Sequence, residues 1–178
     1  MGAEKKDLSA GKVISMKKPS EFSKDELKNL INNYRRLQRT QDAYYSELLQ
    51  EFSLRSGSGL DFETTKKAVL EAAKEQRFLS YKQLADASGA DWVKVHYAMN
   101  THLGDLVEYA HYKGWPLLSA IIVNQKNVET GDMDPSTLKG FVTVARELGY
   151  SVVDEVAFLK EEQQKVFKWA SQASEQQR

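Results

Sequence analysis

The three histidines and the carboxylates near them are the residues of this chain best suited to chemistry. His96, His102 and His111 are its only histidines, and Asp105 and Glu108 lie between the second and the third. Imidazole and carboxylate groups bind Zn²⁺ when several of them converge. The intervals of six and nine residues do not place the histidines one helical turn apart, so convergence needs a turn between the first two. We therefore expect no metal site, although the sequence leaves the convergence of the histidines open.

Other catalytic chemistry has little support in the residue types. The chain has no cysteine, which excludes disulfides, thiolate nucleophiles and cysteine-ligated zinc. No glycine-rich phosphate loop or nucleophile elbow is present, and Ser119, inside an apolar segment, is expected to face a neighbouring side chain. The acidic residues around Gly131 do not follow the register of a calcium loop, so a plain turn or wing is expected there. We predict no catalytic residue, no cofactor and no enzymatic activity.

A second candidate chemistry is the binding of nucleic acid. Lysine side chains neutralise phosphates, and amide side chains hydrogen-bond to base edges in the major groove. Residues 91–100 are expected to form a recognition helix, and residues 124–134 a loop that follows the next strand. The candidate nucleic-acid-binding residues are Lys82, Lys94, Asn100, Gln125, Lys126 and Asn127.

The charge balance argues against a general coating of nucleic acid. Lys+Arg and Asp+Glu both total 25, so the net charge is zero, whereas proteins that bind phosphates non-specifically usually carry a basic excess. The candidate residues are therefore either contacts to DNA or ordinary solvated side chains. Locally the signs also balance, with Arg77, Lys82, Lys94 and Lys113 against Asp86, Asp91, Asp105 and Glu108.

A cluster of aromatic residues supports a different kind of partner. Tyr109 and Tyr112 come just before Trp115, and aromatic side chains often anchor protein interfaces. The same residue types also occur as half-buried core aromatics. These three are the candidate residues for a protein interface.

Helix start and stop signals predict the elements that position these residues. Ser23 with Glu26, and Ser80 with Gln83, form capping boxes in which each side chain satisfies a free amide of the first turn. Apolar residues at intervals of three and four then mark the helical faces. The expected helices span 23–37, 41–55, 61–76, 80–89, 91–100, 103–113, 134–149 and 155–171, with strands at 77–79 and 117–123.

This order predicts an α+β, mostly helical protein: a winged-helix-like core with a small sheet, plus an N-terminal helical hairpin. The apolar face of the hairpin must pack on its own core or on a second copy, which would give a homodimer through residues 23–56. The expected divisions are a flexible N-terminus at 1–22, the hairpin at 23–56, the core domain at 60–170 and a flexible tail at 171–178.

Residues 78–123 resemble the DNA-binding domain of the alkylguanine-DNA alkyltransferases and their alkyltransferase-like relatives. The resemblance rests on the segments 78–85, 95–100 and 116–123, read as strand and helix, second helix, and strand. It implies a winged-helix fold and double-stranded DNA as a partner. Where that family has Pro-Cys-His-Arg, this chain has the residues 120–123, Ala-Ile-Ile-Val, so alkyl transfer is excluded. Residues 60–169 are also similar to a widespread family of bacterial proteins, a likeness that implies no function.

The leading expectation is thus a non-enzymatic bacterial DNA-binding or DNA-associated protein. The alternative is a protein-protein interaction module on a winged-helix scaffold without DNA contacts. Lysines clustered on one face would favour the first, and an exposed apolar patch the second. No apolar run approaches the roughly 20 residues of a membrane span, and the N-terminus lacks the apolar segment of a secretory signal, so a cytoplasmic location is expected.

Overall fold

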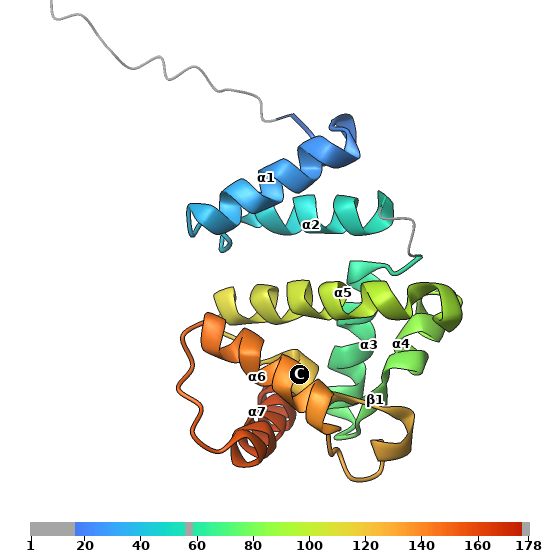
Figure 1. Cartoon of the computed structure of the whole chain (residues 1–178), viewed down its shortest axis with the longest axis vertical. Coiled ribbons are helices and arrows are strands. Elements are labelled where there is room, and N and C mark those ends of the chain that lie inside the picture. The colour runs from blue at the N-terminus through green and yellow to red at the C-terminus, as the bar shows by residue number, and fades with distance from the viewer. Residues whose placement is uncertain (1–16, 56–58, 176–178) are drawn as a thin grey trace, which may run out of the picture.

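The computed structural model describes residues 17–55 and 59–175, and it shows a mostly helical protein with one small parallel sheet (Figure 1). The predicted start signals operate as expected: the capping boxes at residues 23 and 80 both form, and Asp61 and Asp91 cap the helices that follow them. The helices are α1 (Lys24–Arg36), α2 (Ala43–Arg55), α3 (Phe62–Lys74), α4 (Tyr81–Ala87), α5 (Trp92–Tyr112), α6 (Pro135–Glu147) and α7 (Glu155–Glu175); the strands are β1 (Leu79–Ser80) and β2 (Ile122–Val123); and the 3-10 helices are η1 (Pro19–Glu21), η2 (Leu118–Ile121) and η3 (Gln125–Asn127).

The N-terminal hairpin, α1 and α2, has a small apolar core of its own and lies against α5 in Figure 1. The turns of its two helices pack on each other, and α2 also contacts α3 and α5. Of the two arrangements expected for the hairpin, packing on its own chain is the one observed. A homodimer through residues 23–56 stays a prediction.

The main core is formed by α3, α5, α6 and α7 around the segment 117–123, which is buried along its whole length. This segment was predicted to be a strand, and that prediction was wrong for most of it. Four of its residues form η2, and only Ile122 and Val123 pair with β1. Polar side chains of α7 satisfy the irregular backbone: Glu162 accepts from the amide of Leu117 at 3.2 Å, and Gln163 donates to the carbonyl of Ala120 at 3.0 Å. The apolar composition of residues 117–123 thus predicted the burial of this segment correctly, but it did not predict the backbone conformation.

The separate helices predicted at 91–100 and 103–113 are one continuous helix, α5. The expected turn near Thr101 is absent because an unbroken apolar stripe through Val95, Met99, Leu106 and Ala110 packs on the core. Burial of that stripe on every turn holds the helix together across the polar residues between its halves.

The two strands pair in parallel, with Leu79 opposite Ile122 and Ser80 opposite Val123. In the described part of the chain the sheet has only these two strands, so no antiparallel hairpin pairs with β1 as the wing of a winged helix would. The loop after β2 folds instead into η3 and a turn closed at Gly131. Asp134 precedes α6 but makes no side-chain cap, because it bonds Asn124 and Lys126 instead.

The ends of the described chain are more ordered than predicted. Residues 19–21 form η1 within the expected flexible N-terminus, and α7 continues through residue 175 into the expected flexible tail. Residues 1–16, 56–58 and 176–178 lie outside the described residues, and so do the predictions that fall on them. No described helix combines the length and the apolar character needed to cross a membrane.

Candidate functional site

A groove of about 500 Å³ lies between α5 and α6, with the start of α4 at one end and η2 at its floor. Helix α5 contributes residues at intervals of three and four, and α6 does the same, so each helix presents one face. The lining residues are Tyr81, Trp92, His96, Met99, Asn100, Leu103, Gly104, Val107, Ser119, Asn124, Met133, Ser136, Thr137, Gly140, Phe141 and Val144.

The groove is apolar and aromatic, and no Asp, Glu, Lys or Arg side chain lines it. Tyr81 and Trp92 stack at one end, with their ring centroids 6.4 Å apart and their planes within 16°. Burial raises the pKa of Tyr81, and a hydrogen bond with Thr137 of α6 opposes that shift. This end of the groove is therefore a rigid aromatic wall tied to both sides.

Ser119 is the polar group at the floor of the groove. It is only 8% exposed, and within the described chain its hydroxyl has no hydrogen-bond partner. We had expected this serine to face a neighbouring side chain, but it faces the groove. Among the described residues, Thr40 Oγ1 is the fully buried side-chain oxygen that lacks a hydrogen bond. The hydroxyl of Ser119 is instead open to the groove, so it is available to a molecule bound there.

Two glycines keep the groove wide at its middle. Gly104 lies inside α5 and Gly140 inside α6, both line the groove, and a Cβ atom added to either would meet no atom within 4 Å. Neither has the positive φ angle that requires glycine. A helix-interior glycine is about 1 kcal/mol less favourable than alanine. Neither packing nor backbone conformation therefore requires glycine at these two positions.

We predict that Gly104→Ala and Gly140→Ala each raise the free energy of unfolding by about 0.5–1 kcal/mol, because helix propensity improves without a clash. Urea unfolding monitored by circular dichroism measures the change. Gly114→Ala is the contrasting variant: it has equally open space but a φ of +69°, so it should lose stability. Destabilisation by either helix variant would show that the space is not free.

The outer edge of α5 continues the groove as an exposed apolar strip. Val93 is 74% exposed and Tyr97 is 85% exposed, one helical turn apart and next to Trp92 and His96. Ring contacts join Trp92 to His96 and His96 to Tyr97, so the strip is contiguous. Contiguous apolar patches, unlike single exposed side chains, often mark contact surfaces. Sequence reasoning missed these two residues, together with both groove glycines. Glycine inside a helical pattern was the available signal for the latter.

Two of the three candidate DNA-binding lysines are ion-paired. Lys82 pairs with Asp86 at 2.9 Å, and Lys126 pairs with Asp134 at 3.0 Å. Lys94 is exposed and has no ion pair in the described chain, and it lies about 120° around the axis of α5 from Asn100. Asn100 lines the groove, while Gln125 and Asn127 lie on η3 with Lys126.

The aromatic candidates for a protein interface are half-buried. Tyr109 packs edge-on against Phe62 and Trp115, and Trp115 packs against Trp169 of α7. Tyr112 adjoins His111 at the end of α5. Together they form the rim of the core, not an exposed apolar patch.

The three histidines do not converge. His96 contacts the carbonyl of Val93, His111 contacts the hydroxyl of Tyr150 at 3.2 Å, and His102 is buried under the hairpin. The described residues contain no group of three metal-ligating side chains that could hold an ion.

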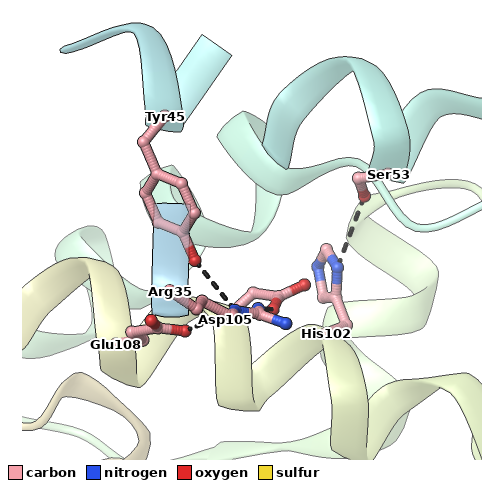
Figure 2. Close-up of polar contacts among 6 residues, drawn as sticks. All are labelled: Arg35, Tyr45, Ser53, His102, Asp105 and Glu108. Carbon is pink, nitrogen blue, oxygen red and sulfur yellow. Dashed lines mark hydrogen bonds and ion pairs between the residues drawn. The ribbon is translucent and has the colours of Figure 1, made fainter. Parts of the chain in front are cut away.

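Figure 2 shows the polar contacts between the hairpin and α5. The guanidinium of Arg35 donates to Asp105, to Glu108 at 3.1 Å and to the hydroxyl of Tyr45 at 3.0 Å. Burial raises the pKa of Asp105 to about 6, against the opposing effect of Arg35. Neither the α5/α6 groove nor the shallower hollow beside Trp169 is lined by these residues. The arrangement suits a structural tie better than catalysis.

His102 forms the second tie. Its Nε2 lies 2.7 Å from Thr65 Oγ1, and its Nδ1 lies 3.4 Å from Ser53 Oγ. Ser53 gives its proton to the carbonyl of Leu60, so Ser53 accepts from Nδ1–H. Burial lowers the pKa of His102 to about 4, and in the neutral ring Nε2 then accepts from the hydroxyl of Thr65.

We predict a pH dependence from this lowered pKa. The unfolded imidazole gains a proton near its ordinary value of 6.5, but the folded one only near 4. Between these values the unfolded state binds more protons, so the free energy of unfolding decreases as pH falls, by at most about 1.4 kcal/mol per pH unit. Asp105 acts in the opposite direction, because its raised pKa makes protonation favour the folded state.

The test therefore compares the pH dependence of the free energy of unfolding between wild type and His102→Gln. Wild type should lose about 2.5 kcal/mol relative to His102→Gln between pH 6.5 and pH 4, since both proteins share Asp105. Urea unfolding at several pH values provides the two curves. Parallel curves would mean that the imidazole titrates alike in the folded and unfolded chains.

Comparisons of this chain with protein-family models, curated proteins and solved structures found no match.

Proposed function

We propose that this protein is a non-enzymatic protein-interaction module whose described core keeps the element order of a winged-helix unit without its antiparallel wing. Its contact surface is the outer edge of α5, centred on Val93 and Tyr97. The observation that carries the proposal is the exposure of these side chains, 74% and 85%, on one edge of one helix.

The energetics favour a protein partner at this edge. Tyrosine supplies a large, stiff contact area with a polar tip, and interface energy concentrates in such residues. Val93, Trp92 and the groove behind them extend the apolar area. A nucleic acid would gain little here, because no lysine or arginine lines the adjoining groove and its affinity depends on phosphate neutralisation.

The test compares two matched surface variants. We expect Tyr97→Asp to reduce capture of the partner by at least about tenfold, as for an interface hot spot. Val153→Asp is the control, since Val153 is 96% exposed and lies outside the groove, between α6 and α7. Quantitative affinity capture with mass spectrometry, using both variants and wild type as bait, measures the effect.

A protein enriched by wild type and Val153→Asp but lost with Tyr97→Asp supports the proposal. If no protein distinguishes the two aspartate variants, the edge of α5 is not the contact surface.

Double-stranded DNA is the second candidate partner. The first observation in its favour is the element order of a helix-turn-helix unit, which this chain follows in α3, β1, α4, α5 and β2. The second is Lys94, an exposed lysine without an ion pair in the described chain. Fluorescence anisotropy of a labelled random duplex, at two salt concentrations, tests this candidate. Salt-sensitive binding that disappears in the Lys94→Glu, Lys126→Glu double variant would support it, and unchanged affinity in that variant would exclude this face.

A further inference from the structure

The groove between α5 and α6 has the properties of a small-molecule site in addition to the protein contact proposed for the α5 edge. Its volume, about 500 Å³, lies within the roughly 300–1,000 Å³ of known ligand pockets. Its walls are mostly apolar and aromatic, with a few polar side chains among them. That combination is typical of sites that bury a ligand and orient it by one or two hydrogen bonds.

Two residues that line the groove have no side chain. Gly104 and Gly140 come from different helices, and neither is needed for backbone conformation or packing. A larger side chain at either position would begin in open space beside the groove that both residues line. An occupant there can approach the backbone of both helices.

Ser119 is an independent observation that points to a ligand. The residue is 8% exposed and lines the groove, and its hydroxyl makes no hydrogen bond within the described chain. Asn100 lines the same groove from α5. Because a hydroxyl and an amide can each donate and accept, they match a hydroxyl, carbonyl or ring nitrogen of a ligand.

The charge of the lining restricts the ligand class. A carboxylate or phosphate bound in this groove would lose hydration without gaining a lysine or arginine partner. A cation would likewise find no aspartate or glutamate, so binding of either charged group is unfavourable. The stacked Tyr81 and Trp92, with Phe141 across the groove, favour a planar ring system. We propose that the groove binds a small, uncharged, planar molecule whose hydrogen-bonding group is directed at Ser119.

The test uses 2-naphthol as the probe and the full chain labelled with ¹⁵N. Amide signals of Gly104, Gly140 and Asn100 should shift on titration, giving a dissociation constant. Naphthalene lacks the hydroxyl and should bind more weakly, and the charged 2-naphthoate should bind at least tenfold more weakly than 2-naphthol.

Variants then locate the probe. Ser119→Ala should weaken 2-naphthol roughly five- to tenfold and leave naphthalene unchanged. Gly104→Leu should abolish binding of both while thermal unfolding shows an intact fold, and Gly140→Leu provides the same test from α6. Lys139→Ala, at an exposed position of α6 outside the groove, is the matched control and should bind as wild type does.

Several results would overturn the proposal: groove signals that do not move at millimolar 2-naphthol, wild-type binding by folded Gly104→Leu, or equal affinity for 2-naphthoate. Tyr97→Asp should retain the affinity for 2-naphthol. The protein-contact proposal and the ligand proposal can therefore fail separately.

Discussion

Replacing Arg35 with methionine should lower the free energy of unfolding by about 2–3 kcal/mol and loosen the hairpin from α5. The variant keeps the aliphatic length but leaves Asp105 and Glu108 without their shared cation (Figure 2). Both carboxylate side chains are only 17% exposed. Removing one partner of a fully buried pair is unfavourable by about 3–5 kcal/mol, and the 36% exposure of Arg35 reduces the expected effect.

Urea unfolding measures the loss for Arg35→Met, and hydrogen exchange of the α1 and α2 amides measures the release of the hairpin. Arg36→Met is the matched control, since Arg36 is exposed and contacts only Asn33 of its own helix. Adding Asp105→Asn and Glu108→Gln to Arg35→Met should recover most of the loss, because the uncompensated charges are then gone. Equal stability of the Arg35 and Arg36 variants would contradict a role for this cluster in docking.

The second large effect is expected at Gly131, the turn between η3 and α6. Its φ is +72°, and a Cβ atom would lie 2.2–2.6 Å from the ring of Phe78. In alanine the left-handed backbone conformation is unfavourable by about 1 kcal/mol. The added Cβ would also displace the ring of Phe78, which packs on Phe167. We expect Gly131→Ala to lower the free energy of unfolding by about 2–4 kcal/mol.

Gly149→Ala separates the two contributions. Its φ is +93°, but no atom lies within 4 Å of the added Cβ, so only the backbone penalty of about 1 kcal/mol applies. Urea unfolding of the two variants under the same conditions gives the comparison. If Gly131→Ala lowers the free energy of unfolding no more than Gly149→Ala does, then the ring of Phe78 can move without loss of stability.

The predictions that held depend on local interactions. Ser23, Asp61, Ser80 and Asp91 cap helices as expected, because a cap joins residues two or three positions apart and is complete within its own segment. A mostly helical protein with a small sheet followed from the same signals. The joined helix α5 and the 3-10 turn at η2 were missed, since both depend on what packs against them.

The groove could not be read from the sequence for a related reason. In the sequence, Ser119 is one polar residue in an apolar segment, which predicts burial. Its hydroxyl is accessible only because α5 and α6 are separated above it by the groove. Lys126 looks like a free cation by pattern, but Asp134 pairs with it across a loop after folding, and residue types do not specify that geometry. The pair of Lys82 with Asp86 is different, because an interval of four residues on one helix makes it readable from the sequence.

The sequence alone determined where the chain becomes helical, which faces are apolar, and that no thiol chemistry is available, since these properties reside in residue type and near-neighbour spacing. The tertiary structure decided how the hairpin docks through Arg35 and His102, and where Gly104 and Gly140 leave space. These depend on contacts between residues far apart in the chain, whose energies arise only when burial removes water from both partners.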